Sequence, residues 1–288
     1  MLTTETATTA LGPVEYAVSG DGAPVLVIHG SPGGCDQAEL MARFLPQSQF
    51  KAILPSRPGY LGTELGERKT IDQQADLLVA LLDELGIATA SLLTWSGGGP
   101  AGYRIAVRHP DRVTGLVALD AVSTAFPRPH DDLTTRFMFG TRAGDFLMRV
   151  MIAHAPEQVI QGTIHSESSL SKEEVAQRAS EIFEDETKRQ FVLDLALTAS
   201  RHDRSAGYDN DIAQFEAIDT LELERITAPT MIVQGNADSD VPLAQSEHAA
   251  AAIPNAQLAI LGGGSHLCFY THPDSADVQA RAVEVLRG

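Results

Sequence analysis

A serine followed by three glycines is the feature that most constrains what this chain can fold into. The segment Ser96 to Gly99 lies between an apolar run, Ala90 to Leu93, and a stretch with helical spacing, Ala101 to His109. This order predicts a buried strand, a very tight turn and the start of a helix. Since the residue at the apex of such a turn has a strained backbone, its neighbours must be small.

The apex position suits a nucleophile. The turn would raise the Ser96 hydroxyl above a sheet edge and leave the N–H of Gly97 free at a helix N-terminus, where it can stabilise an oxyanion. A plain glycine-rich turn or a phosphate-binding turn would not need serine here, and neither G-K-[ST] nor G-x-G-x-x-G follows. The usual motif is G-x-S-x-G, whereas Thr94 stands two residues before the serine. Strands accept threonine readily, so Thr94 weakens the motif without excluding it.

Alternating strands and helices surround this segment. Continuous apolar runs indicate strands buried on both faces, and apolar positions three and four residues apart indicate the helices between them. The pattern therefore predicts an α/β fold with a doubly wound, mostly parallel sheet. The expected strands are Pro13 to Val18, Pro24 to Ile28, Phe50 to Leu54, Ala90 to Leu93, Val113 to Leu119, Thr230 to Gln234 and Gln257 to Leu261.

The strand rhythm stops after Ala121 and resumes at Thr230, with helical segments dominating between Ser123 and about Arg225. A chain of 288 residues is long enough for one large domain with an inserted subdomain. We therefore predict an α/β core formed by residues 1–122 and 226–288, and a helical cap or lid formed by residues 123–225.

A serine hydroxyl needs a base, and a histidine oriented by a carboxylate supplies one. His266 follows the last expected strand in a glycine-rich loop, at the sheet edge where open α/β folds bind ligands. Asp238, just beyond the strand ending at Gln234, ranks first as the carboxylate. Asp120 ranks second and Asp240 third. An unperturbed imidazole titrates near pH ~6.5, so activity should rise with pH through that region.

The second oxyanion donor is expected in the loop from His29 to Gly34, after the strand Pro24 to Ile28. Pro32 has no N–H, so Ser31 is the natural donor beside Gly97. His29 is interpreted as a structural residue of the loop.

Four segments, taken in order, resemble the α/β-hydrolase fold superfamily, in its capped, esterase-like form. They are His29 to Gly33, Trp95 to Gly98, Gly235 to Pro242 and Gly264 to His266. The resemblance covers nearly the whole chain and implies a Ser-His-Asp hydrolase that needs no cofactor or metal. Haloalkane dehalogenases and epoxide hydrolases use Asp where this chain has Ser96. Proline iminopeptidases usually carry Trp after the serine, whereas Trp95 precedes it. Carbon–carbon bond hydrolases often have an aromatic residue where Leu267 follows the histidine.

The function predicted is hydrolysis of carboxylic esters through an acyl-enzyme. A lactonase, a carbon–carbon bond hydrolase and a proline iminopeptidase-like peptidase are the enzymatic alternatives. A ligand-binding receptor on the same fold is the non-enzymatic one. The substrate is expected to be a small to medium, mostly apolar molecule, because a region rich in Phe and Met in the insert can line an irregular pocket. Its predicted substrate-binding residues are Phe139, Phe146 and Met148.

The formal net charge of −17 argues against nucleic acid and anionic membranes as partners. The start of the chain has no basic segment or apolar core typical of a signal peptide, and no stretch is apolar enough to span a bilayer. The chain has two cysteines, Cys35 and Cys268, so a disulfide framework is unlikely and a reducing compartment is favoured. A cytoplasmic location is therefore expected, with the oligomeric state left open.

Overall fold

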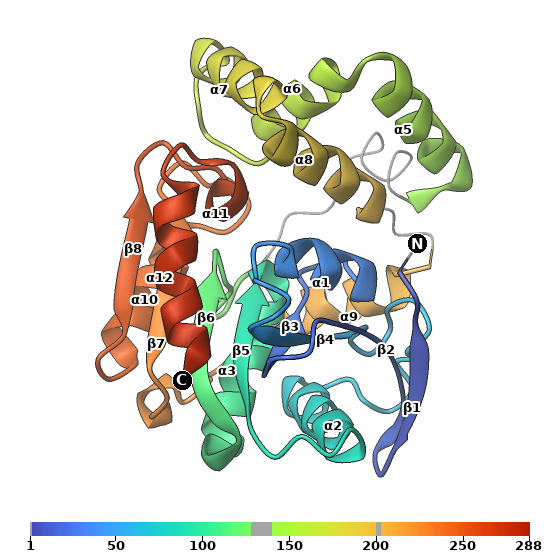
Figure 1. Ribbon diagram of the computed structural model, residues 1–288, viewed down its shortest axis with the longest axis vertical. Helices are drawn as coiled ribbons and strands as arrows, with labels where there is room; N and C mark the ends of the chain where they lie inside the picture. The colour runs from blue at the N-terminus through green and yellow to red at the C-terminus, as the bar shows by residue number, and fades with distance from the viewer. Residues whose placement is uncertain (1, 128–139, 200–202) are drawn as a thin grey trace.

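One eight-stranded sheet carries the core of the protein (Figure 1). The computed structural model describes residues 2–127, 140–199 and 203–288. In the sheet the strands are ordered β1-β2-β4-β3-β5-β6-β7-β8, and every pair from β4 to β8 is parallel. The predicted α/β class with a mostly parallel sheet is confirmed. The strands are β1 Glu5–Thr9, β2 Gly12–Ser19, β3 Ala23–Ile28, β4 Phe50–Pro55, β5 Ala90–Trp95, β6 Val113–Leu119, β7 Thr230–Gly235 and β8 Gln257–Leu261.

Helices cover both faces of the sheet, which explains why its central strands are mostly apolar. Successive side chains of β3 point to opposite faces, so Val25 and Val27 join one buried cluster while Leu26 and Ile28 join the other. The first cluster includes residues of α1 (Cys35–Ala42), α11 (Cys268–Thr271) and α12 (Ser275–Arg287). The second includes residues of α2 (Ile71–Glu84), α3 (Gly99–Arg108) and α10 (Leu243–Ala252).

The strand β1 was not expected from the sequence. It is antiparallel to β2, which is in turn antiparallel to β4, so these two strands extend the parallel sheet at one edge. Only Ala7 and Thr9 of β1 are buried, and its other residues are polar and exposed. An edge strand with so little apolar content gives no hydrophobic pattern to recognise.

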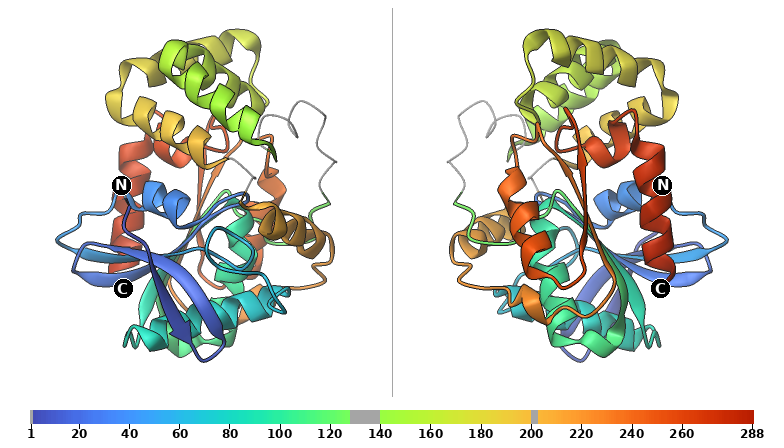
Figure 2. Two further views of the ribbon diagram at one scale, coloured as in Figure 1. Left: turned by 90° about the vertical axis from the view of Figure 1, so that its right-hand side faces the viewer. Right: turned by 90° about the vertical axis from the view of Figure 1, so that its left-hand side faces the viewer.

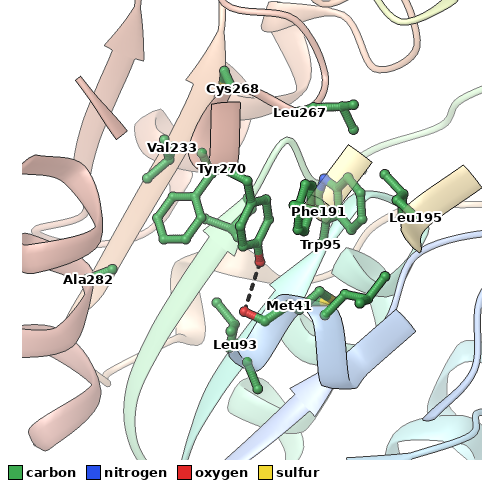
Figure 3. Close-up of a cluster of buried hydrophobic side chains, with 14 of the residues drawn as sticks. Met41, Leu93, Trp95, Phe191, Leu195, Val233, Leu267, Cys268, Tyr270 and Ala282 are labelled. Carbon is green, nitrogen blue, oxygen red and sulfur yellow. Dashed lines mark hydrogen bonds between the residues drawn. The ribbon is translucent and has the colours of Figure 1, made fainter. Parts of the chain in front are cut away.

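Four helices form a layer over the sheet edge at which the parallel strands end (Figures 1 and 2). They are α5 (Arg142–His154), α6 (Pro156–Ser166), α7 (Lys172–Glu184) and α8 (Glu186–Thr198). Phe191 and Leu195 of α8 reach into the first buried cluster, beside Trp95 and Tyr270 (Figure 3). The layer thus packs on the core directly through apolar side chains.

The helix α9 (Ser205–Glu216) also lies in the inserted region, but Phe215 belongs to the buried cluster that contains α2 and α3. The predicted cap, residues 123–225, therefore includes a helix, α9, that packs beside α2 and α3 of the core and apart from the layer of α5 to α8. Short 3-10 helices complete the chain at η1 (Ser96–Gly98), η2 (Pro110–Arg112) and η3 (Leu223–Arg225). Within the described residues, no helix has the length and apolar character needed to cross a membrane.

Candidate active site

Ser96 is at the apex of a strained turn between β5 and α3. Its φ is +52°, in the left-handed region that non-glycine residues rarely occupy, and its side chain lies in a pocket at the sheet edge. The glycines after it are required by close packing. A Cβ on Gly97 would collide with Ser31 Oγ, and one on Gly98 would collide with the backbone oxygens of His29 and Ile28. The glycine run therefore brings the turn against the loop after β3.

Thr94, the departure from the usual motif, is accommodated by a glycine on the neighbouring helix. A Cβ on Gly102 would lie 3.0 Å from the Cβ of Thr94 and 3.1 Å from its Cγ2. The threonine therefore fills space that a side chain on α3 would otherwise occupy. Its hydroxyl is buried and has no hydrogen-bond partner.

Asp238 and His266 lie together at the ends of β7 and β8. His266 Nδ1 is 2.7 Å from Asp238 Oδ2, and the Asp238 side chain is 0% exposed. The other Asp238 oxygen, Oδ1, accepts the N–H groups of Asp240 and Val241 at 2.8 and 2.9 Å. Gln234 Nε2 donates to Oδ2 at 2.9 Å. The carboxylate is therefore fixed in the position that would orient the imidazole of His266.

The two other candidate carboxylates occupy different places around His266. Asp120 follows β6, is fully buried, and accepts the Gly235 N–H at 3.0 Å. Burial and the neighbouring charge of Asp238 raise the pKa of Asp120 well above its usual value. Asp240 lies on the other side of the ring, with Oδ2 3.5 Å from His266 Nε2. Among the described residues, Asp238 alone has a hydrogen bond to Nδ1.

Three carboxylates around one imidazole change its titration. Burial alone lowers the pKa of His266, but the charge and hydrogen bond of Asp238, then the charges of Asp240 and Asp120, hold that pKa well above its usual value. Trp95 stacks on the ring, with centroids 5.4 Å apart and planes at 23°. The sequence suggests Trp95 only as a packing residue beneath the turn, whereas it also fixes one face of the imidazole.

Metal-ligating atoms also gather here. Asp120, Asp238 and His266 have potential ligand atoms within 4.8 Å of one another, and so do Glu167, Asp240 and His266. Both groups use the imidazole nitrogens of His266. A metal bound by either group would take up one nitrogen of this imidazole.

Ser96 and His266 line one pocket of about 430 Å³. Ser31 lines it too, so the structure brings together predicted residues from three distant parts of the chain. The inserted region contributes Glu167, Leu195 and Ala199. The remaining lining residues are Gly30, Pro32, Gln37, Trp95, Asp240 and Leu267.

The predicted substrate-binding residues are not among these. Phe146 is 70% exposed on α5, and Met148 packs against the first buried cluster. Phe139 falls outside the described residues. The Phe and Met content indicates an apolar layer, but it does not say which helix faces the serine. Leu195 carries a usable signal, because it lies one helical turn from the buried Phe191 and so shares its face.

Backbone hydrogen bonds join the inserted layer to the loops that carry Asp238 and His266. The N–H of His266 donates to the carbonyl of Glu167 at 3.0 Å, and the N–H of Ser169 donates to that of Ala237 at 2.7 Å. A β-bridge also pairs Ser168 with Asp238. The connection between α6 and α7 is thus attached to both loops.

A strained serine turn, a buried Asp–His pair and a mostly parallel sheet together define a class of protein. A family model for the alpha/beta hydrolase fold matches residues 23–273, so the chain belongs to this family of hydrolases. A solved alpha/beta hydrolase fold protein from Nakamurella multipartita is 49% identical, with a TM-score of 0.97 over 99% of both chains.

Two curated relatives are more distant. The hydrolase YcgS of Bacillus subtilis (strain 168), described as uncharacterized, is 28% identical over 271 residues, which cover 91% of each protein. The 2-hydroxymuconate semialdehyde hydrolase of Pseudomonas putida is 26% identical over 270 residues, which cover 92% of this chain and 87% of that protein. The family and its hydrolytic chemistry are thus shared.

Proposed function

We propose that this hydrolase cleaves carboxylic esters through an acyl-enzyme. Ser96 is the nucleophile, His266 takes its proton, and Asp238 holds the imidazole in the required tautomer and orientation. The observation that carries the proposal is the left-handed Ser96 in the same pocket as a buried histidine that is hydrogen-bonded to Asp238. This is the arrangement that activates a serine for acyl transfer.

The reaction then proceeds in two halves. Ser96 Oγ attacks the ester carbonyl, and the N–H groups of Gly97 and Ser31 stabilise the oxyanion that forms. Protonated His266 gives its proton to the leaving alcohol. Water, deprotonated by the same histidine, then releases the acyl group from Ser96.

The charge of the pocket supports a neutral substrate. Glu167 and Asp240 are its ionisable lining residues besides His266, and no lysine or arginine is among the described residues that line it. The carboxylates of Glu167 and Asp240 would repel the negative charge of an anionic substrate. The Pseudomonas putida relative acts on a compound whose name denotes a carboxylate, so this pocket favours an ester over such a carbon–carbon cleavage substrate.

A panel of chromogenic esters with acyl chains of increasing length tests the proposal, with a lactone, a vinylogous 1,5-diketone acid and a prolyl amide as the alternatives. Ser96→Ala should lower turnover of the best substrate by roughly four to six orders of magnitude, because the triad acts as a unit. A fluorophosphonate should label Ser96, as located by peptide mass spectrometry.

The proposal fails if the parent protein hydrolyses none of the esters, if the Ser96→Ala variant retains activity, or if the label falls on another serine. If the protein prefers one of the three alternative substrates, Ser96 remains the proposed nucleophile, but the bond that it cleaves is not that of an open-chain carboxylic ester. Binding of the panel without turnover would support the receptor alternative.

A further inference from the structure

A fully buried ion pair lies directly behind the pocket. Arg57, just after β4, and Asp211, on α9, are 1% and 2% exposed. Arg57 Nη1 and Nη2 donate to the two Asp211 oxygens at 3.0 and 2.6 Å. The Tyr60 hydroxyl also donates to Asp211. Burying two charges is costly even when they are paired, so stability alone is a weak reason for such a pair.

Arg57 Nη1 also donates to Gln74 Oε1 on α2 at 3.1 Å, and its other donors reach the loop after β3. Nε donates to the carbonyl of His29 and Nη2 to that of Gly30, both at 3.1 Å. Nη2 also donates to Ser31 Oγ at 3.1 Å, and that hydroxyl in turn donates to Asp211. One guanidinium therefore contacts three consecutive residues, and the carboxylate from α9 holds the third.

The His29 ring completes the attachment. Its Nε2 accepts the backbone N–H of Arg57 at 2.9 Å, so the ring proton is on Nδ1, which donates to the Gly30 carbonyl at 2.8 Å. Burial and the charge of Arg57 lower the pKa of His29 well below its usual value, which keeps the ring neutral.

The hydroxyl of Ser31 is occupied on both sides, as a donor to Asp211 and as an acceptor from Arg57. Its backbone N–H is therefore the group that can serve an oxyanion. Ser31 is also in close contact with the turn, because a Cβ on Gly97 would collide with Ser31 Oγ. A shift of the Ser31 side chain would change the spacing of the two N–H groups. Stabilisation of an oxyanion depends on such donors being fixed before the reaction.

We propose that Arg57 and Asp211 are positioning residues for the oxyanion hole, which set the N–H of Ser31 against that of Gly97. Through Asp211, a helix of the inserted region contributes to catalysis without touching the substrate. This inference rests on the proposed esterase function, and its test separates the two.

Three variants address the pair. Asp211→Asn keeps the shape and removes the charge. Arg57→Met/Asp211→Asn removes both charges, so that no lone charge is left buried. Ser31→Ala keeps the ion pair and the N–H but cuts the link between them. Arg104→Met is the control, because it removes a mostly buried arginine that pairs with the more exposed Asp72 and Glu222, and none of these three residues lines the pocket.

Each variant is titrated with a fluorophosphonate, so that kcat is expressed per competent Ser96, and its melting temperature is recorded. Loss of one oxyanion donor costs about 10²–10³ in kcat. We expect kcat to fall about 10- to 100-fold in both Asp211 variants and about tenfold in Ser31→Ala, with KM nearly unchanged. Affinity for a trifluoromethyl ketone, which forms a tetrahedral adduct, should fall in parallel, and the pH midpoint set by His266 should stay constant.

Arg104→Met should lower the melting temperature with kcat per site unchanged. The inference is overturned if kcat per site and ketone affinity in Arg57→Met/Asp211→Asn and Ser31→Ala stay within about twofold of the parent. It is also overturned if a shift of the pH midpoint accounts for the loss of kcat, because the effect would then lie at His266. If Asp211→Asn does not fold, the other two variants decide. Loss of the proposed function would look different, since the parent itself would then hydrolyse no ester.

Discussion

His266 lies between two carboxylates with different relations to its two nitrogens. Asp238 accepts from Nδ1, as a residue that orients the ring would, while Asp240 faces Nε2, the nitrogen that receives the serine proton in the proposed mechanism. A carboxylate on that side stabilises the imidazolium and competes for Nε2 in the resting site. In the proposed mechanism, the pocket would therefore stabilise the imidazolium of His266 well, but more of His266 would already be protonated, and unable to accept the serine proton, before the reaction starts.

The acid limb of the pH profile is the direct consequence. The proposed mechanism needs neutral His266, and the pKa of His266 is held well above the usual value by Asp238, Asp240 and Asp120 against the effect of burial. We therefore expect kcat/KM to rise at a pH above the ~6.5 of an unperturbed imidazole. This moves the expectation from the sequence to higher pH.

Asp240→Asn should shift that midpoint to lower pH, because the imidazolium loses one neighbouring negative charge. The measurement is kcat/KM against pH for the best ester, in the parent and in this variant. A midpoint at or below about 6.5 in the parent, or one that Asp240→Asn leaves in place, would contradict the assignment.

Asp238 and Asp120 are separated by mutation to asparagine. Asp238→Asn should cost on the order of 10⁴ in kcat, because the amide would favour the wrong tautomer of His266. Asp120→Asn should cost far less, since Asp120 accepts from Gly235 rather than from the imidazole. Both variants are assayed on the same ester, with thermal melts to check folding. A crippled Asp120→Asn beside an active Asp238→Asn would reverse the roles.

At the scale of the element, the packing of β5 on α3 shows how a turn with Thr94 can still form. Sequence motifs describe one segment, whereas the space that Thr94 needs is supplied by Gly102 on the following helix. The two residues act as a pair, because the Thr94 side chain on the strand fills the space that the missing side chain of Gly102 leaves on the helix.

The pairing makes the effect of Gly102→Ala depend on residue 94. Alanine favours a helix over glycine by about 1 kcal/mol, but crowding a packed contact costs about 1–3 kcal/mol. Gly102→Ala should therefore destabilise the parent and stabilise a Thr94→Gly background. Urea unfolding of the four proteins gives the coupling free energy. Equal effects in the two backgrounds would show that the residues do not share this space.

The elements differ in how far their sequence predicts them. The strands β3, β5 and β6 are mostly apolar because helices cover both faces, and that pattern is visible without a structure. The strand β1 is polar and takes its conformation from pairing with β2, so the sequence alone does not reveal it. The pattern after Ala121 predicts helices, but their orientation depends on contacts between α8 and the core.

The site divides in the same way. Ser96, Asp238 and His266 follow strand ends, and the carboxyl ends of parallel strands meet at one edge, so their proximity is predictable. Arg57 and Asp211 are 154 positions apart and neither follows a motif, so no local pattern links them. Glu167 and Ala199 depend on the path of the inserted layer over the pocket.

For the whole molecule, the position of the helical layer decides which residues can select the substrate. Leu195 and Ala199 line the pocket with Ser96, whereas Phe146 is on the exposed face of α5. A pocket discriminates by about 1–3 kcal/mol per methylene, which corresponds to roughly 10- to 200-fold in kcat/KM.

Leu195→Ala and Ala199→Leu should therefore shift the preferred acyl length in opposite directions, by up to about that range. Phe146→Ala, the control on the same layer, should leave the ratios unchanged. The measurement is kcat/KM over the ester series, normalised within each variant. If Phe146→Ala alters the ratios and the two pocket variants do not, the layer faces the substrate with another surface.

The backbone links between the α6–α7 connection and the loops of Asp238 and His266 bear on how such a chain can diversify. Main-chain groups make these links, at Glu167 and Ser169, so they hold for almost any side chains placed there. Substitutions in the helical layer can therefore change the substrate while Asp238 and His266 keep their positions. During evolution, the path and length of the α6–α7 connection are therefore constrained more than its side chains. We expect selection against insertions and deletions in this connection to be stronger than selection against substitutions.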